Sequence, residues 1–174
     1  IESKPSKPTM TSVPSVLHPV KNDHLAEVLK LPLRVETSAV FPLSARSVWE
    51  LVSDFNSLPD YHASITSSEV SQGGLVREIG LTEDAGGGFV VERLVYFNED
   101  SREFSYMIIG LINCRFPLRQ YQAYVKLEEV EDHVCRLHWG SVFTVEGITD
   151  VEGEAIARNI YQGCFDGIRR VLVK

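Results

Sequence analysis

The chain has few cysteines, the residues whose disulfides stabilise very small or secreted folds. Its 174 residues include only three cysteines, Cys114, Cys135 and Cys164. Their number is odd and they lack the spacing of a metal site, so we expect neither disulfides nor a bound metal, and a reduced, cytoplasmic setting. No cofactor is expected either, because the Gly86–Gly88 triplet lacks the Lys-Ser/Thr of a phosphate cradle and is better interpreted as a hairpin turn.

Long apolar runs and an excess of positive charge are also missing. No segment approaches the roughly 18 consecutive apolar residues of a membrane-spanning helix, and the start of the chain lacks a secretion-signal pattern. Lys and Arg total 17 against 24 Asp and Glu, a net charge of -7, which argues against nucleic acids and anionic membranes as partners. With 44% hydrophobic residues, the composition predicts a soluble monomer or homodimer whose core can enclose a cavity.

The first 32 residues differ in composition from the rest of the chain. Residues 1–14 are mostly Ser, Thr, Lys and Pro without apolar periodicity, and are predicted to be a lead that is flexible or foreign to the natural chain. Residues 15–32 are predicted to form an extension in which residues 24–30 make a short helix before Pro32. The folded domain is expected to span 33–174.

Hydrophobic periodicity predicts the elements of this domain. Residues 33–41 alternate between apolar and polar, as a half-buried strand does. Ser44 is a candidate N-cap for a helix at 45–55, which a short helical turn at about 60–64 follows. Residues 65–146 then read as six strands separated by short turns. Connections this short join antiparallel neighbours, so parallel crossovers are excluded.

The chain closes with an amphipathic helix at 150–174. Within it, Gly163 and Gly167 lie one turn apart, so they are expected to let the helix approach the sheet closely or to leave room for a ligand. The order of elements predicts an α+β fold, in which a seven-stranded curved antiparallel sheet wraps the long C-terminal helix, with one or two short helices after the first strand. The apolar stripe predicted to cover the sheet consists of Ile156, Ile160, Cys164, Ile168, Val171 and Leu172.

Two charged residues fall on faces that the alternation assigns to the interior. Arg77 shares a face with Ile79, and Glu92 shares one with Leu94, although the apolar Val91 leaves the orientation of Glu92 open. If both are inside, desolvation requires that they pair. The pair would then be a polar spot in an apolar cavity or would only fasten neighbouring strands.

Aromatic side chains are expected to line this cavity, between the sheet and the long helix. Their hydroxyl and indole groups need partners when buried, which favours a site with polar content over simple core filling. His62, which follows a predicted helix break at Pro59, can titrate near neutrality and act as an acid or base, or be a solvated loop histidine. The predicted ligand-binding residues are Tyr61, Tyr106, Tyr121, Trp139, Phe143 and Ile160.

Several segments together resemble a known family. The pattern V-W-x-x-V-x-x-F-x-x-L-P-x-W-H is matched by SARSVWELVSDFNSLPDYH, except that Tyr61 stands where Trp is more usual. With GLVREIGL, FVVERLVYF, SREFSYMI, RQYQAYVKL, CRLHWGSVF and IYQGCFDGIRRVL, the chain from about 33 to 174 resembles the polyketide cyclase/dehydratase-type branch of the START-like (SRPBCC) superfamily. The resemblance implies the helix-grip fold of the birch pollen allergen and the plant abscisic-acid receptors, with a hydrophobic ligand cavity. Residues Arg77, Glu92, Tyr106, Tyr121 and Trp139 fall at positions characteristic of that branch.

Two classes of function follow from the resemblance. In the first, the protein is an enzyme, a lyase or isomerase that promotes cyclisation, dehydration or isomerisation of a polyketide-like or aromatic molecule. Glu92 would be its general acid or base, Arg77 would set the ionisation of Glu92 or stabilise an enolate, and His62 would assist. In the second, the same cavity only carries or senses a lipid, isoprenoid or aromatic metabolite.

Overall fold

The computed structural model describes residues 33–174. The predicted lead at 1–14 and the predicted helix at 24–30 lie outside the described residues. Short 3-10 turns follow two of the strands, at Gln72–Gly74 and Glu83–Ala85. In chain order the other elements are β1 (Val35–Phe41), α2 (Ala45–Val52), α3 (Leu58–Tyr61), β2 (Ile65–Ser71), β3 (Val76–Leu81), β4 (Phe89–Asn98), β5 (Glu103–Ile112), β6 (Leu118–Glu131), β7 (Val134–Val145) and α4 (Asp150–Leu172).

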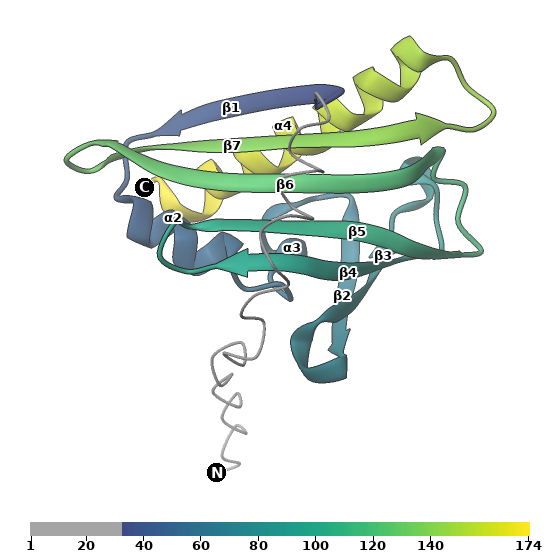
Figure 1. Cartoon of the computed structure of the whole chain (residues 1–174), viewed down its shortest axis with the longest axis horizontal. Coiled ribbons are helices and arrows are strands. Elements are labelled where there is room, and N and C mark those ends of the chain that lie inside the picture. The colour runs from purple at the N-terminus through teal and green to yellow at the C-terminus, as the bar shows by residue number, and fades with distance from the viewer. Residues whose placement is uncertain (1–32) are drawn as a thin grey trace.

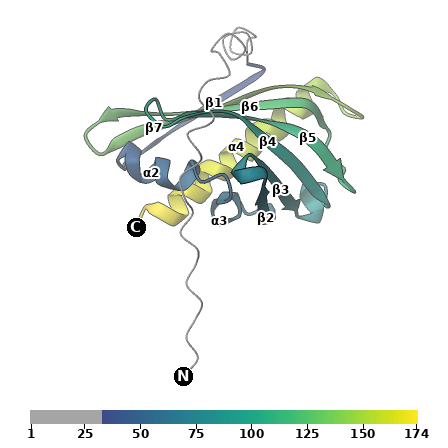
Figure 2. The same ribbon diagram turned by 60° about the horizontal axis from the view of Figure 1, so that its bottom comes forward.

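All seven strands form one antiparallel sheet, in the order β1-β7-β6-β5-β4-β3-β2 (Figure 1). Strands β2 to β7 follow one another as a meander. The first strand, β1, lies at the edge next to β7, where Val35 pairs with Ser141 and Phe41 with Cys135. The sheet curves around α4, and α2 and α3 lie on the same side as α4 (Figure 2). The predicted helix-grip architecture is therefore confirmed.

The boundaries of the helices differ from the expectations by a few residues. Ser44 caps α2, because its side chain accepts a hydrogen bond from the backbone N–H of Ser47. Helix α2 ends at Val52 rather than at residue 55, and α3 begins at Leu58, two residues earlier than predicted. Proline is compatible with a first helical turn, so Pro59 lies inside α3 instead of stopping the helix before it.

Helix α4 buries a face that is rotated from the predicted stripe. Cys164 and Ile168 are buried as expected, but Val171 is 39% exposed, and Ile156 and Ile160 are only half-buried. A capping box between Thr149 and Glu152 fixes the start of the helix. The fully covered side of the helix also includes Gly153, Ala157, Tyr161, Phe165 and Gly167.

The two inner glycines of α4 do allow a close approach, but to α3 rather than to the sheet. A Cβ atom at Gly167 would collide with the backbone carbonyl of Tyr61, and one at Gly163 would lie 2.9 Å from Nε2 of His62. There is consequently no room for a ligand at either glycine. This contact fixes α3, and with it His62, against the middle of α4.

None of the helices between residues 33 and 174 combines the length and apolarity needed to cross a membrane.

Candidate ligand-binding site

A cavity of about 570 Å³ lies between the concave face of the sheet and α4. This volume is within the range of small-molecule sites, which is roughly 300–1,000 Å³. Its walls come from α3, from β2 to β7, from α4, and from the two loops 82–88 and 113–117 at its mouth. The residues that line it are mostly apolar, and those with apolar side chains include Leu58, Ile65, Ile79, Leu81, Val90, Ile108, Phe116, Pro117, Ile156 and Ile160.

The polar centre of the inner wall is a buried ion pair. Arg77 and Glu92 stand opposite each other on β3 and β4, and Nε of Arg77 donates to Oε2 of Glu92 over 2.6 Å. Their exposed fractions are only 3% and 5%. The ambiguous alternation of β4 is thereby resolved, because Val90, Glu92 and Leu94 are buried while Phe89 is 40% exposed.

The guanidinium group of Arg77 is held from several sides. Its Cζ lies 4.0 Å from the centroid of the Phe55 ring and 5.0 Å from that of Tyr106, and Nη1 donates to the backbone carbonyl of Phe55 over 2.9 Å. Burial opposes the charged form, but the Glu92 carboxylate and the neighbouring tyrosines more than offset burial, so the pKa of Arg77 is raised. Arg77 therefore stays protonated and lies behind Glu92 rather than in the cavity wall.

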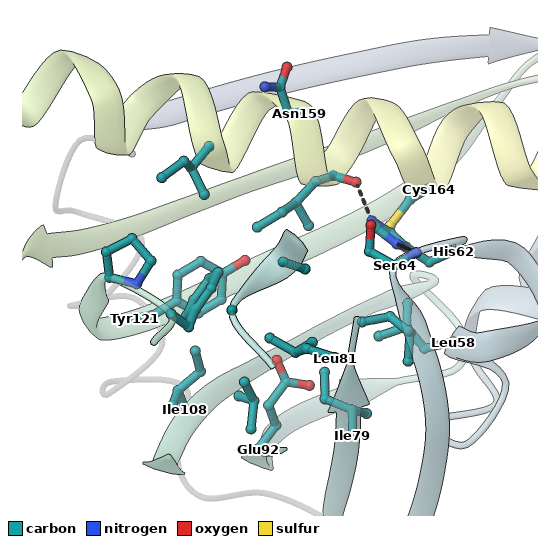
Figure 3. A pocket seen from close by; sticks show the side chains of 18 of the residues that line it. Leu58, His62, Ser64, Ile79, Leu81, Glu92, Ile108, Tyr121, Asn159 and Cys164 are labelled. Atoms are coloured by element: carbon teal, nitrogen blue, oxygen red, sulfur yellow. Dashed lines mark hydrogen bonds between the residues drawn. The ribbon is translucent and has the colours of Figure 1, made fainter. Parts of the chain in front are cut away.

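Of the two residues in this pair, Glu92 is the one that faces the cavity. It lines the cavity, and its carboxylate points from β4 towards the space below α4 (Figure 3). Oε2 is engaged by Arg77, whereas Oε1 has no hydrogen-bond donor among the residues that the structure describes. The inner wall thus presents one open acceptor that carries part of a negative charge.

Tyr106 and Tyr121 add hydroxyl groups to the inner wall, and Tyr161 lies behind it as a hydrogen-bond partner. Tyr121 and Tyr161 hydroxyls are 2.8 Å apart, and Tyr161 donates onward to Oγ of Ser141. On the same wall, Nε1 of Trp139 donates to the Tyr106 hydroxyl over 3.2 Å. Burial raises the pKa of Tyr106, Tyr121 and Tyr161, so these phenols remain neutral hydrogen-bonding groups near neutral pH.

His62 occupies the wall between α3 and α4, with both ring nitrogens engaged. Its Nε2 lies 3.1 Å from the carbonyl of Ile160 (Figure 3). Its Nδ1 accepts from the backbone N–H of Ser64 over 3.2 Å. An acceptor on one side and a donor on the other select the neutral tautomer that carries its proton on Nε2. Burial lowers the pKa of His62 and outweighs the hydrogen bond to the Ile160 carbonyl, which acts in the opposite direction, so the ring is neutral.

Charged side chains gather at the mouth of the cavity. Arg115 pairs with Glu83 over 3.2 Å, both side chains are largely exposed, and Asp84 lies beside them. The glycine triplet belongs to the β3–β4 hairpin connection, as the sequence predicts, and all three glycines have positive φ angles. At Gly88 a Cβ would collide with the carbonyl of Asn113, so this glycine lets the two mouth loops pack together.

The structure brings most of the sequence-predicted site residues to one cavity. Glu92, His62, Tyr106, Tyr121, Trp139 and Ile160 line it, whereas Arg77, Tyr61 and Phe143 do not. Tyr61 belongs to α3 and is 1% exposed, and Phe143 stacks on Tyr121.

Sequence reasoning did not identify Tyr161, Asn159 or the residues of the mouth. Tyr161 was not part of the predicted apolar stripe, which was drawn through Ile160 and Cys164. The register of a stripe is uncertain by one residue when a tyrosine stands next to an isoleucine. The mouth residues lie in loops without hydrophobic periodicity, so no pattern in the sequence pointed to them.

A curved antiparallel sheet closed by a long C-terminal helix over an internal cavity is the START-like, helix-grip fold. A START superfamily protein from Mycobacterium smegmatis matches with a TM-score of 0.68 at 12% identity, covering 79% of this chain and 95% of its own. Ara h 8.0201 matches with a TM-score of 0.64 at 21% identity, over 79% of this chain and 95% of its own.

A family model described as polyketide cyclase / dehydrase and lipid transport matches residues 32–173, and the chain belongs to this family. The protein XoxI from Bacillus cereus is similar in structure, with a TM-score of 0.73 and 28% identity over 80% of this chain and 95% of that protein. No curated protein matches the chain in sequence. The family has members of more than one function, so the identity of the ligand depends on the site itself.

The buried pair predicts large losses of stability for the two single variants, and these losses should not add in a double variant. Arg77→Ala and Glu92→Ala should each lower the free energy of unfolding by roughly 3–5 kcal/mol, because each leaves a buried charge without its partner. The double variant Arg77→Met/Glu92→Leu should lose less than the sum of the two, since no charge is left behind. Urea unfolding followed by circular dichroism measures these values.

Arg115→Ala is the matched control for this experiment. It breaks an exposed Arg–Glu pair and should change the free energy of unfolding by less than about 1 kcal/mol. A cost for Arg77→Ala no greater than that for Arg115→Ala would contradict a structural role for the buried pair.

His62 predicts a pH dependence of stability. Because its pKa in the folded protein is lowered, the unfolded chain takes up a proton near its ordinary pKa of 6.5 that the folded protein does not. Stability should therefore be full above pH 6.5 and fall on acidification by up to about 1.4 kcal/mol per pH unit, until the folded ring titrates. The His62→Gln variant keeps an amide that can donate to Ile160, and it should lack this component. If the urea midpoints of the two proteins change with pH by the same amount, the prediction is wrong.

Proposed function

We propose that this protein binds one small, largely hydrophobic molecule between its sheet and α4, and that it carries or senses this molecule. The observation that supports the proposal most directly is the cavity of about 570 Å³, whose walls are mostly apolar, with a few polar groups at the inner end and charged side chains at the mouth. Apolar walls supply affinity by removing ligand surface from water, and the polar groups set orientation. The lipid transport in the family description is in keeping with this function.

The state of the ionisable groups favours binding over proton transfer. His62 uses both nitrogens in structural hydrogen bonds, and burial lowers its pKa. Burial raises the pKa of Cys164 and of the tyrosines, so none of them is a ready nucleophile or base. Glu92 is tied to a permanent cation, which keeps its carboxylate in place.

The two tryptophans of the chain provide a test for this function. Trp139 lines the cavity, whereas Nε1 of Trp49 donates to Glu99 at a separate place. Titration with the neutral fluorophore N-phenylnaphthylamine should shift the indole N–H resonance of Trp139 in a ¹⁵N spectrum and leave that of Trp49 unchanged. Native mass spectrometry of the purified protein should in addition show a copurified small molecule or a saturable one-to-one complex with the fluorophore. Absence of binding, or a shift confined to Trp49, would overturn the proposal.

Acid-base catalysis is the second candidate, and one observation favours it. Oε1 of Glu92 faces the cavity without a partner among residues 33–174, so it is the one inner-wall carboxylate oxygen that a substrate can reach there. In this function Glu92 removes a proton next to a carbonyl group of a folded polyketide-like chain, and Arg77 holds the carboxylate in place. Cyclisation or dehydration would follow from the enolate so formed.

The conservative variant Glu92→Gln separates the two candidates. If the protein is an enzyme, this variant should form cyclised product from a synthetic poly-β-ketone about 100-fold more slowly than the wild type, because an amide is not a base at neutral pH. Chromatography of the products over time measures both rates. Equal rates for the wild type, the variant and the protein-free solution would exclude Glu92 catalysis and leave binding as the function.

A further inference from the structure

The polar groups of the inner wall do not satisfy one another completely. Oε2 of Glu92 accepts from Arg77, while Oε1 has no donor in the described part of the chain. The Tyr121 hydroxyl has its partner in Tyr161, which in turn donates to Ser141. Among the described residues, the fully enclosed side-chain atoms without a partner are Asn56 Oδ1 and Ser68 Oγ. Oε1 of Glu92 is not one of them and Glu92 lines the cavity, so this oxygen is open to a group that enters from outside the protein.

Tyr106 is left with an unused donor. Its oxygen accepts the indole N–H of Trp139, but its own O–H has no acceptor among residues 33–174. The side chain is only 4% exposed and lines the cavity. A buried phenol normally donates its proton, so the cavity wall also presents one open donor.

The open acceptor and the open donor belong to the same end of the cavity. Arg77 contacts both side chains, through the 2.6 Å hydrogen bond to Glu92 and through a guanidinium position 5.0 Å from the Tyr106 ring centroid. The two residues also stand on neighbouring strands, β4 and β5, where Leu94 pairs with Tyr106 and Glu92 with Ile108. A single small group of a ligand can therefore meet both.

We propose that this end of the cavity binds the hydroxyl group of an otherwise apolar ligand, a phenol or an alcohol. The ligand O–H donates to Oε1 of Glu92, and the ligand oxygen accepts the O–H of Tyr106. A hydroxyl is the smallest neutral group that both donates and accepts at one atom, so it satisfies both open positions at once. The inference rests on the proposed binding function and adds the chemical class of the ligand to it.

Charged head groups fit this end poorly. A carboxylate would face the Glu92 carboxylate in an apolar environment. The cation that could bind it, Arg77, does not line the cavity and uses Nε and Nη1 for Glu92 and the Phe55 carbonyl. An ammonium group would bring a second cation to a carboxylate that Arg77 has neutralised. The site thus selects a neutral alcohol over a free fatty acid or an amine.

Four probes of one shape test this inference: pyrene and its hydroxy, methoxy and carboxylate derivatives, each substituted at the same ring position. Fluorescence titration near neutral pH should rank hydroxypyrene at least about tenfold tighter than methoxypyrene, because the ether accepts but cannot donate to Glu92. Pyrenecarboxylate should bind most weakly of the four.

Two variants locate the preference on the named residues. Tyr106→Phe removes the donor and should weaken hydroxypyrene about tenfold with little effect on pyrene. In Glu92→Gln, Arg77 should retain the amide oxygen, so that an NH₂ group faces the cavity and the affinities for hydroxypyrene and methoxypyrene fall within about threefold of each other. The matched controls are Tyr124→Phe and Glu103→Gln, an interacting Tyr–Glu pair that does not line the cavity, and both should keep the wild-type ranking.

The outcomes separate the inference from the proposed function. If pyrene binds but hydroxypyrene and methoxypyrene bind equally, or if pyrenecarboxylate binds most tightly, the function stands and the hydroxyl site is overturned. If none of the four probes binds, the proposed function fails and the inference with it. If Glu92→Gln does not fold by circular dichroism, Tyr106→Phe decides alone, and an affinity for hydroxypyrene relative to pyrene that is unchanged in that variant overturns the inference.

Discussion

The ion pair of Arg77 and Glu92 is the constraint on which the cavity depends. A carboxylate in an apolar wall is stable only if a cation compensates it at close range, and the 2.6 Å hydrogen bond provides that compensation. The same guanidinium packs on Phe55 and Tyr106 and binds the Phe55 carbonyl, so it joins β3, β4 and β5 to the segment between α2 and α3. One buried cation therefore positions the polar end of the site and also fixes the elements around it.

The fold was predictable because its signals are local. Alternating strands, short turns and one long amphipathic helix define the order of elements, and antiparallel pairing follows from the short connections. The family resemblance then supplied the helix-grip arrangement. The start of α2 also followed from local chemistry, since Ser44 is a capping residue.

The site was predictable only in part, because its details depend on three-dimensional packing. Alternation alone left Glu92 undecided, since the residues on both faces of β4 are apolar, and the burial of Arg77 opposite it resolved the orientation. Tyr61 and Phe143 were expected in the cavity, yet both are buried and neither lines it. The close approach at Gly163 and Gly167 was expected, but the partner is α3, which no sequence period could identify.

The collision that any side chain at Gly167 would suffer also has a consequence for how the cavity can adapt. The backbone of α4 touches the backbone of α3 there, and two backbones in contact have no side chain that can yield. The C-terminal half of α4 is therefore a fixed pivot, and adjustments to ligand size must come from the N-terminal half of the helix and the loops 82–88 and 113–117. Ligands of different length would be accommodated by movements of these segments at the mouth, while the hydrogen-bonding geometry at the inner end stays the same.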